Sequence, residues 1–287
     1  GAMHIDLHTH SNVSDGTDTP TRLVLNARAA GLATVALTDH DTLDGIQEAR
    51  AAGRRIGIHV VPGVELSAEV DGREVHLLGY GPRLDHRDLN AELTRIRLGR
   101  RDRLPAMLDK LARLGVPLTM AEVEAQAGAA GTALGRPHVA DALIAKGEVA
   151  NRQEAFERFL DRNGPAFVPR PAAELTAGVD LLHAAGAAVV LAHPGIRGMD
   201  EVLTGELIEM LAREHGLDGI EVDYPLHDAS TRDLYHRLGA RLDLVRTGSS
   251  DYHGTGKVGH DLGCVLTREP AFRELLSRVA ARGGVVR

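Results

Sequence analysis

The chain is poor in the residues that stabilise small secreted domains and large aromatic cores. It has one cysteine, Cys264, so an internal disulfide is excluded and we expect a reducing, cytoplasmic environment. Tryptophan is absent and aromatics make up 3% of the 287 residues, so the core must consist of Ala, Val, Leu and Ile. No apolar run of about 18 residues is present, which argues against a membrane span. The sequence also lacks a basic stretch followed by an apolar segment, so we expect no secretory signal.

Basic residues are outnumbered by acidic ones, 33 Lys and Arg against 40 Asp and Glu. The net charge is −7 and the pI is near 6.1, which argues against general binding of duplex DNA because such binding needs a basic face. A small anionic substrate remains compatible, since bound cations can reverse the field within one cleft. The residue in excess is histidine, with fifteen copies, and histidine is the commonest metal ligand. The sequence does not indicate the oligomeric state.

Seven short apolar, β-branched runs recur, most of them separated by alanine-rich helical stretches. Strands that alternate with helical patterns indicate βα units and a mostly parallel sheet. Six of the seven runs end in or near an acid or a histidine, and α/β barrels place their active sites at the carboxyl ends of the strands. We therefore predict a seven-stranded, irregular α/β barrel. The runs are His4–His10, Thr34–His40, His59–Leu66, Glu74–Gly79, Ala187–Pro194, Gly219–Tyr224 and Leu244–His253.

Residues 81–164 interrupt this alternation. They read as helical, with capping-box patterns at Thr119 and Glu122 and at Asn151 and Glu154, and they lack β-rich runs. We predict a barrel formed by residues 3–80 and 165–287, with 81–164 as a helical insertion, or cap, domain. Its basic residues between 95 and 113 favour a solvated helix face, and the alternative is a surface that meets a phosphate-bearing substrate. These residues are Arg95, Arg97, Arg100, Arg101, Arg103, Lys110 and Arg113.

The pair His8 and His10 is the strongest single indication of a metal site. Residues two apart on a strand point to the same side, so both imidazoles can reach one cation. Two neutral histidines at a strand end suit zinc or manganese. Asp251 and His253 repeat this spacing in the last run.

Other potential ligands lie near the ends of the intervening runs. Alone, Asp15 is typical of a turn residue and His76 of a core histidine. Glu65 would be costly to bury without an arginine or a cation. We assign Asp41 to a helix N-cap and expect His40 to face the barrel mouth. One shared metal centre explains nine candidates at once: His8, His10, Asp15, His40, Glu65, His76, His193, Asp251 and His253.

The motifs resemble those of the polymerase-and-histidinol-phosphatase (PHP) superfamily. The blocks that carry this resemblance are Asp6–Ser11, Leu37–Asp41, Pro62–Glu65 and Ser250–Gly254. The chain is similar in particular to the branch that removes phosphate from nucleoside 3′,5′-bisphosphates and trims RNA from the 5′ end. That narrower likeness rests on Gly135–Ala140, Glu154–Phe156, Ala192–Gly195 and Gly219–Val222. Tyr252 departs from the pattern, because phenylalanine is more usual there.

The resemblance implies a distorted (β/α)7 barrel with a helical insertion and two or three divalent cations. Manganese is the usual ion, with zinc or iron as alternatives. Glu65 would bridge the first and second positions. The first cation would bind His8, His10, Glu65 and Asp251, the second Glu65, His76 and His193, and the third Asp15, His40 and His253.

These ligands predict hydrolysis of phosphate esters. Two cations lower the pKa of a water molecule, so that hydroxide attacks phosphorus in line, with Glu65 and Asp251 in the catalytic centre. Arg136 suits a phosphate because its planar guanidinium binds in a bidentate way. His227 is our candidate general acid. Arg170 and His138 are further substrate-binding candidates, and a residue of the first helical turn is the alternative for His138.

Four alternatives compete with a nucleotide phosphoesterase. A histidinol-phosphate-type phosphatase would share the metal cluster. A polymerase-associated exonuclease domain is less expected, because no polymerase segment accompanies the motifs. A metal-dependent amidohydrolase often uses a bridging lysine, but none of Lys110, Lys146 and Lys257 ends an early strand. A structural or regulatory metal module would favour cysteine ligands. The substrate stays open among a bisphosphate nucleotide, a cyclic phosphate and an RNA end.

Overall fold

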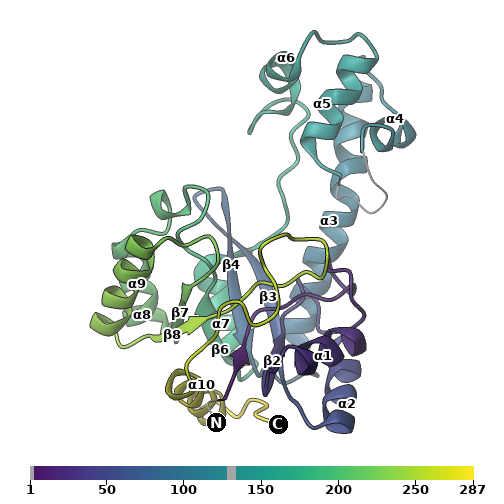
Figure 1. Ribbon diagram of the computed structural model, residues 1–287. Coiled ribbons are helices and arrows are strands. Elements are labelled where there is room, and N and C mark those ends of the chain that lie inside the picture. The colour runs from purple at the N-terminus through teal and green to yellow at the C-terminus, as the bar shows by residue number, and fades with distance from the viewer. Residues whose placement is uncertain (1–2, 128–133) are drawn as a thin grey trace. The chain divides into compact units, whose positions relative to one another are not determined.

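The computed structural model describes residues 3–127 and 134–287, which form two compact units (Figure 1). Gly1–Ile96 and Ala172–Arg287 make up the barrel unit, and Arg97–Pro171 the helical unit. The sequence placed the insertion at residues 81–164, so both boundaries lie later in the structure. The first boundary moves because the start of helix α3 (Arg87–Arg113) packs on the barrel through the buried side chains of Leu89, Leu93 and Ile96.

The barrel unit is built on a nearly closed sheet. Among the described residues, seven strands follow the order β1-β2-β3-β4-β6-β7-β8, and the short β5 (Ala173–Glu174) pairs with β3. A bridge between Thr9 and Tyr252 joins the two edges, with a 2.7 Å hydrogen bond from the His10 N–H to the Tyr252 carbonyl. The predicted barrel is therefore confirmed. The strands are β1 (Ile5–Asp6), β2 (Thr34–Leu37), β3 (His59–Val70), β4 (Arg73–Tyr80), β6 (Ala188–Leu191), β7 (Gly219–Asp223) and β8 (Val245–Gly248).

Strand β4 is the irregular member of the sheet. It runs antiparallel to both β3 and β6, whereas the other pairs are parallel. Asp71 and Gly72 connect β3 to β4, and both have positive φ angles, 49° and 71°, as a two-residue hairpin turn requires. The hairpin places the beginning of β4 beside the end of β3, so that His76 pairs with Ser67.

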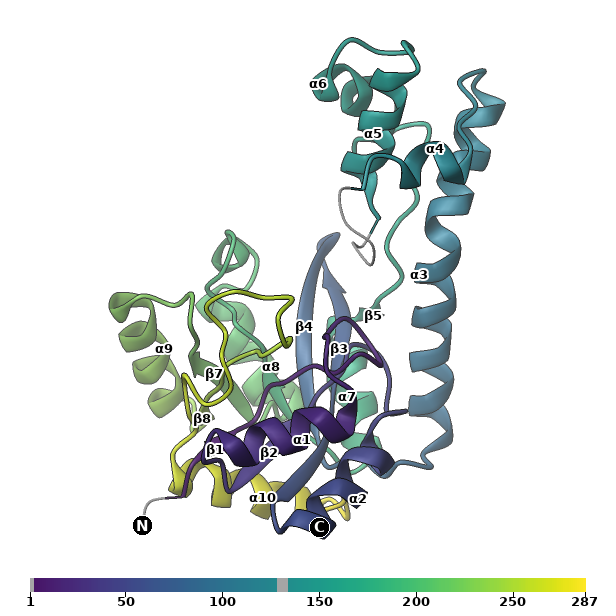
Figure 2. The same cartoon turned by 45° about the vertical axis from the view of Figure 1, so that its right-hand side comes forward.

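Helices cover the outside of the sheet (Figures 1 and 2). Helices α1 and α2 lie side by side, and α8 and α9 lie on the side of the sheet that carries β7 and β8. Side chains at the N-termini accept backbone hydrogen bonds, for example Thr19 for α1, Thr204 for α8 and Asp228 for α9. The helices are α1 (Pro20–Ala29), α2 (Ile46–Ile56), α7 (Leu175–Ala184), η2 (Met199–Glu201), α8 (Gly205–His215), α9 (Ala229–Arg241) and α10 (Glu269–Ala281).

The inside of the barrel is filled mainly by small and branched side chains, as the shortage of aromatics predicts. Tyr80 is an exception, and its hydroxyl donates to the Leu7 carbonyl at 2.6 Å. Helix α10 packs on this core through Phe272, Leu275 and Val279. The strand core is therefore sealed at one end. The core residues of the strands include Ile5, Ala36, Val61, Leu78, Ala188, Val190 and Val245.

The helical unit has a core of its own. It contains the rest of α3 together with α4 (Met120–Glu124), α5 (Arg136–Ala145), α6 (Arg152–Ala155) and the π-helical turn η1 (Phe156–Leu160). Leu111, Val139 and Leu160 are among its buried residues. The predicted capping box of Thr119 and Glu122 is confirmed. Asn151 caps α6, but the Glu154 carboxylate accepts from the Ala150 N–H instead of closing the box.

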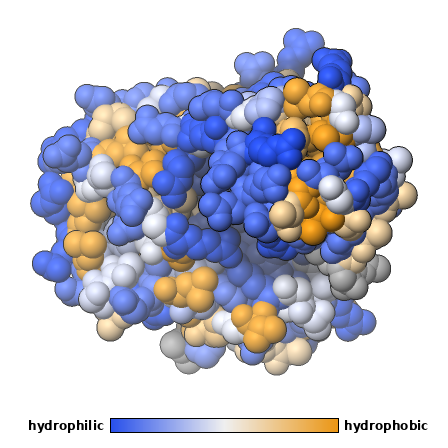
Figure 3. All heavy atoms as spheres, turned by 90° about the horizontal axis from the view of Figure 1, so that it is seen from above, coloured by the Kyte–Doolittle hydropathy of each residue, from blue (hydrophilic) through white to orange (hydrophobic). Residues whose placement is uncertain are grey.

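Polar side chains predominate on the face shown in Figure 3, where apolar residues gather in separate patches. Within the described ranges, every helix falls short of the length and apolar character needed to cross a bilayer.

A buried aspartate should contribute strongly to the stability of the barrel. Asp218 Oδ2 accepts from the Val189 N–H at 2.8 Å and lies 2.9 Å from the His183 ring and 2.7 Å from Arg282. Burial raises the pKa of Asp218, but these partners outweigh burial and lower it below its ordinary value. We expect Asp218→Asn to lower the free energy of unfolding by about 2–4 kcal/mol at pH 7.

Urea denaturation measures this loss. Because the folded-state pKa is depressed, the contribution is present above the unfolded-state pKa near 4 and fades as the pH falls through the folded-state value. The exposed Asp233, which pairs with Arg237 one helical turn away, provides the control variant Asp233→Asn with a change below about 0.5 kcal/mol. Equal stabilities of the two variants would contradict the assigned role.

Candidate metal centre

His8 and His10 follow β1, where the barrel closes. Thr9 between them is fixed to the β2 segment, because its Oγ1 donates to the Ala36 carbonyl at 2.6 Å and its N–H donates to Thr38 Oγ1 at 3.1 Å. Alternate residues of extended backbone point to the same side, so both imidazoles enter one space. Their ring centroids lie 5.1 Å apart and both residues are fully buried.

Four side chains converge at this point. Nε2 of His8 lies 2.9 Å from Glu65 Oε1 and 3.1 Å from Asp251 Oδ1. Nε2 of His10 lies 3.0 Å and 3.1 Å from the same two oxygens. Ligand atoms that share an ion at about 2.0–2.2 Å are separated by roughly 3 Å. The group His8, His10, Glu65 and Asp251 could hold one metal ion, and it is the set predicted for the first cation.

The second oxygen of Glu65 faces different histidines. Oε2 lies 2.8 Å from His76 Nδ1 and 3.3 Å from His193 Nε2. His76 reaches this carboxylate because the β3–β4 hairpin brings the beginning of β4 to the end of β3. The two oxygens of Glu65, which is 1% exposed, therefore face two different pairs of histidines. His40, Glu65 and His76 also form a group that could hold an ion.

The third predicted set gathers around an exposed carboxylate. Asp15 Oδ2 lies 3.4 Å from His40 Nε2, and its Oδ1 lies 3.2 Å from His253 Nε2. The rings of His40 and His253 each stack on His10, at 4.4 Å and 4.1 Å between centroids. His10, Asp15, His40 and His253 could hold an ion together, so His10 is shared with the first group.

The donor atoms of the cluster fit metal ions better than they fit each other. Both ring nitrogens of His10, Oε2 of Glu65 and Nδ1 of His76 are buried, and despite the short distances between them they make no well-aligned hydrogen bond within the described residues. Such atoms are costly to bury unsatisfied. Divalent cations would satisfy them, and imidazole with carboxylate is a donor set that suits manganese, zinc or iron. The chemistry of these residues therefore fits bound divalent cations.

The charges of the cluster favour bound cations as well. Burial lowers the pKa of His10, but the Asp251 and Glu65 carboxylates outweigh it and raise the pKa to about 9. The pKa of His76 is raised to about 10 despite burial, chiefly by Glu65. Burial raises the pKa of Glu65, yet the histidines hold it well below its ordinary value. The carboxylates therefore stay ionised and attract positive charge.

Glu221 orients two of the ligands, a role that the sequence analysis missed. Its Oε2 lies 2.8 Å from His8 Nδ1, and its Oε1 accepts from the His193 N–H at 2.8 Å. A proton on His8 Nδ1 shared with Glu221 leaves Nε2 free to bind a metal ion. The sequence signal that could have indicated this role is the position of Glu221 in Gly219–Tyr224. This predicted strand contains none of the nine candidate ligands.

We expect Glu221→Gln to weaken metal binding and to lower kcat/KM by roughly 10-fold to 100-fold. The amide keeps the shape but loses the charge that holds the His8 proton. Metal titration by calorimetry and steady-state kinetics measure both effects. Glu209 is partly exposed and pairs with Arg213 and Arg241, so Glu209→Gln provides the control. Equal metal affinities in the two variants would remove Glu221 from this role.

The acids beside His40 position its loop. Asp39 accepts from the N–H and the hydroxyl of Ser11 at 2.7 Å and 2.6 Å. Asp41 accepts from the N–H and the hydroxyl of Ser67, both at 2.7 Å. The prediction that Asp41 is a helix N-cap is wrong, because Gly45 occupies that position of α2. Asp41 instead ties the loop after β2 to strand β3.

His227 is a structural residue, contrary to the general-acid prediction. Its Nδ1 donates to the Val222 carbonyl at 2.8 Å, and its Nε2 accepts from the Gly195 N–H at 3.1 Å. Both ring nitrogens are therefore occupied by the backbone. Burial lowers the pKa of His227, which keeps the ring neutral. We do not assign it a proton to donate.

Arg136, His138 and Arg170 belong to the helical unit and not to the barrel unit that carries the cluster. Arg136 donates to the Leu160 carbonyl at 3.0 Å and lies over the rings of Phe156 and Phe167. His138 lies in the first turn of α5, where its Nδ1 accepts from the Gly135 N–H at 3.0 Å. Arg170 is exposed. Arg136 and His138 thus have packing and capping roles within their own unit.

The barrel unit supplies two cations near the cluster that the sequence analysis did not select. Lys257 Nζ donates to Asp251 Oδ2 at 2.6 Å and to the Tyr224 hydroxyl at 3.2 Å, which leaves Asp251 Oδ1 toward His8 and His10. Arg197 is exposed and lines a small cavity of about 120 Å³ together with His76 and His193. It follows His193 by four residues, and this proximity was the available signal.

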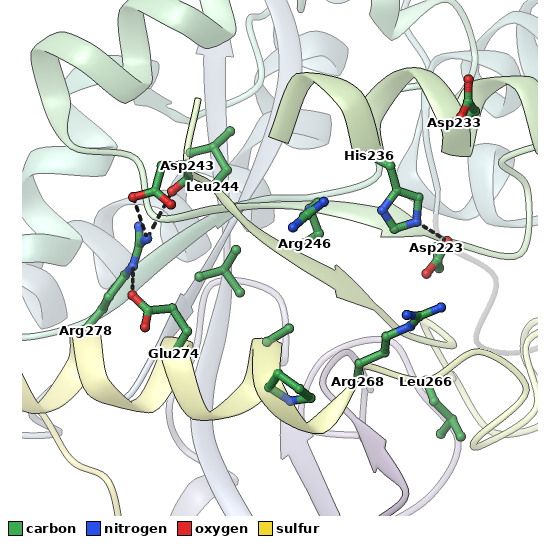
Figure 4. Close-up of a pocket in the computed structure, with 13 residues that line it drawn as sticks. Asp223, Asp233, His236, Asp243, Leu244, Arg246, Leu266, Arg268, Glu274 and Arg278 are labelled. Carbon is green, nitrogen blue, oxygen red and sulfur yellow. Dashed lines mark hydrogen bonds and ion pairs between the residues drawn. The ribbon is translucent and has the colours of Figure 1, made fainter. Parts of the chain in front are cut away.

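A separate groove of about 700 Å³ lies between α9, β8 and α10 (Figure 4). No ligand of the cluster lines it. Several of its charges are paired with one another, since Arg278 approaches Asp243 and Glu274 and His236 approaches Asp223 (Figure 4). It is therefore not part of the metal centre.

A barrel whose strand ends gather histidines around a shared carboxylate fits a metal-dependent hydrolase. The comparisons with known proteins define the class more closely: a metal-dependent phosphoesterase, a hydrolase that acts on phosphoester bonds. The chain belongs to the PHP domain family, whose profile matches residues 6–126. The family and the cluster together indicate divalent metal ions.

Several curated proteins are similar to this chain over most of its length. A 5′-3′ exoribonuclease of Haemophilus influenzae is 34% identical, over 94% of this chain and 98% of its own. A 3′,5′-nucleoside bisphosphate phosphatase of Chromobacterium violaceum is 33% identical, over 97% of each. A phosphoribosyl 1,2-cyclic phosphate 1,2-diphosphodiesterase of Eggerthella lenta is 35% identical, over 89% and 96%. A solved metal-dependent phosphoesterase of Bifidobacterium adolescentis superposes with a TM-score of 0.72 at 35% identity and 97% coverage of both chains.

Proposed function

We propose that the enzyme hydrolyses phosphate monoesters of nucleotides. Nucleoside 3′,5′-bisphosphates would lose the 3′-phosphate. The 5′ ends of short RNA are a second proposed substrate, in which the bond hydrolysed would be a phosphodiester. The names of the Chromobacterium violaceum and Haemophilus influenzae relatives support this choice. The observation that carries it is the Glu65 carboxylate, whose two oxygens face two different sets of histidines.

We assign two or three divalent cations to the nine predicted ligands, with manganese as the expected ion and zinc or iron as alternatives. When bound, such ions would lower the pKa of water and neutralise phosphoryl oxygens. Glu65 would fix the spacing of the first two positions. Asp251 would present Oδ1 to the first, held by Tyr224 and Lys257 through Oδ2. We also propose a cytoplasmic location, because the one cysteine suits a reducing compartment.

We expect Arg197→Met to raise KM for a bisphosphate roughly 10-fold and to change kcat less. A guanidinium beside His76 and His193 would bind a phosphate group and make no contribution to the metal ligands. Steady-state kinetics measure the effect, with the exposed Arg213→Met as control. An unchanged KM would exclude Arg197 from substrate binding.

The same assay tests Arg136. Together with His138 and Arg170, it stays our proposed phosphate ligand from the helical unit. A raised KM for Arg136→Met with an unchanged melting temperature would support that role. A lowered melting temperature with an unchanged KM would leave only the packing on Phe156 and Phe167.

A substrate panel tests the proposed function. Phosphate release with manganese is compared among adenosine 3′,5′-bisphosphate, a short 5′-phosphorylated RNA and histidinol phosphate. We expect one of the first two to react fastest. Preference for histidinol phosphate would overturn the nucleotide assignment and leave the metal chemistry intact.

A second candidate function is hydrolysis of a cyclic phosphate. The Eggerthella lenta relative, named as a cyclic phosphate diphosphodiesterase, favours it at 35% identity. Phosphoribosyl 1,2-cyclic phosphate therefore belongs in the panel. The fastest turnover with this compound would replace the bisphosphate as the proposed substrate.

A further inference from the structure

A basic pocket of about 920 Å³ lies in the barrel unit away from the metal centre. It is formed by α2, the beginning of β3, α10 and the C-terminal residues, which meet near the end of the barrel that carries the C-terminus (Figures 1 and 2). Its polar lining residues are Arg50, Arg54, His59, Arg273, Ser277 and Arg287.

Positive charge in this pocket is only partly compensated. No Asp or Glu is among the described residues that line it. Arg273 pairs with Glu269, and the Arg50 guanidinium donates to a main-chain oxygen of the last residue, Arg287. Arg54 has no carboxylate partner in the described ranges. It lies one helical turn from Arg50, so two positive charges are close together on α2. Burial and, to a smaller extent, the charge of Arg54 lower the pKa of Arg50.

The walls of the pocket include an imidazole and apolar side chains. His59 lines the pocket, while its Nε2 is buried and has no hydrogen-bond partner in the part of the chain that the structure describes. Apolar surface from Ile58, Leu276 and Val286 lies beside it. Arginine matches the planar geometry of phosphate oxygens, and an apolar wall can cover the organic part of a phosphate ester. The pocket thus combines the parts of a site for a phosphorylated small molecule.

Strand β3 separates this pocket from the metal centre. The strand begins at His59, which lines the pocket, and it carries Glu65 in the cluster. Six residues of extended strand span about 20 Å. A ligand in the pocket would therefore contact none of the metal ligands.

We propose that the cavity lined by Arg50, Arg54 and His59 is a second anion site, which binds a phosphate group carried by a small molecule. The proposal does not depend on the reaction of the metal centre. Arg54 is the residue that contributes most, because its charge is not used by the fold.

Equilibrium dialysis of the manganese-loaded protein against radiolabelled inorganic phosphate tests the site, with adenosine 5′-monophosphate in a parallel arm. The compared proteins are wild type, Arg54→Met, the double variant Arg50→Met/Arg54→Met, and Arg55→Met. Arg55 neighbours Arg54 on α2 but does not line the pocket, so it is the matched control. Loss of one charge-assisted contact should weaken binding roughly 10-fold to 100-fold.

We expect wild type and Arg55→Met to bind one more phosphate group per chain than the double variant, and Arg54→Met to bind it 10-fold to 100-fold more weakly. All four proteins should hydrolyse p-nitrophenyl phosphate at the same rate. Equal binding of both probes assigns the site to the phosphate group alone, and stronger binding of the nucleotide assigns it to a phosphate ester. Identical stoichiometry and affinity of both probes in all four proteins would overturn the proposal.

Discussion

Replacing Glu65 with glutamine is expected to lower kcat/KM for phosphoester substrates by roughly 1,000-fold or more. The carboxylate provides one oxygen to the His8 and His10 position and the other to the His76 and His193 position. The amide has a single acceptor oxygen and no charge, so it can serve at most one of these positions. Both metal positions should weaken together.

The control for this variant lies on the same strand. Glu69 is part of β3, but its carboxylate accepts from the Gly72 N–H in the hairpin turn and faces no ligand group. Glu69→Gln should keep kcat/KM within about threefold of wild type, as expected for a surface substitution that leaves the active site unchanged. A fully active Glu65→Gln protein would contradict the bridging role.

Removal of divalent ions by a chelator should abolish hydrolysis, and manganese should restore it. The same treatment should lower the stability of the wild type, because ions that bind only the folded state stabilise it by about 2.7 kcal/mol at one hundred times the dissociation constant. Thermal unfolding with and without chelator measures this shift. The buried carboxylates of Glu65 and Asp251 would then have only protonated histidines and, for Asp251, Lys257 as counter-ions among the described residues.

The Glu65→Gln variant provides the comparison for the chelator experiment. Its melting temperature should respond little to chelation, since its metal positions are already weak. Full activity of chelator-treated wild type, confirmed free of metal, would exclude metal-dependent hydrolysis.

The sequence indicated which side chains come together in the cluster better than it indicated the residues that position them. His8 and His10 could be assigned together because strand geometry fixes the direction of residues two apart. His76 looked like a core residue, since nothing near it ends a strand. The antiparallel β4 explains its position, and the Asp71–Gly72 turn was the overlooked signal.

Residues that act through other residues could not be predicted in the same way. The role of Glu221 depends on contacts with His8 and the His193 N–H, which are 213 and 28 residues away along the chain. His227 carried the right chemistry for an acid, but the backbone groups that occupy both of its nitrogens are a property of the folded chain. Side-chain type indicates what a residue can do, and packing decides what it does.

The boundary of the helical unit shows the same limit. Residues 87–96 are helical, so pattern alone grouped them with the insertion. The burial of Leu89, Leu93 and Ile96 against the barrel assigns them to the other unit. A helix that begins in one unit and ends in the next gives no local sign of where the first unit stops.

The most direct test is the metal content of purified protein after equilibration with manganese, measured by plasma mass spectrometry. Shared coordination by distant histidines and carboxylates predicts two or three ions per wild-type chain and at least one fewer in Glu65→Gln, with Glu69→Gln matching the wild type. A wild-type chain that retains one ion or none, or a Glu65→Gln protein that retains the full complement, would contradict the account.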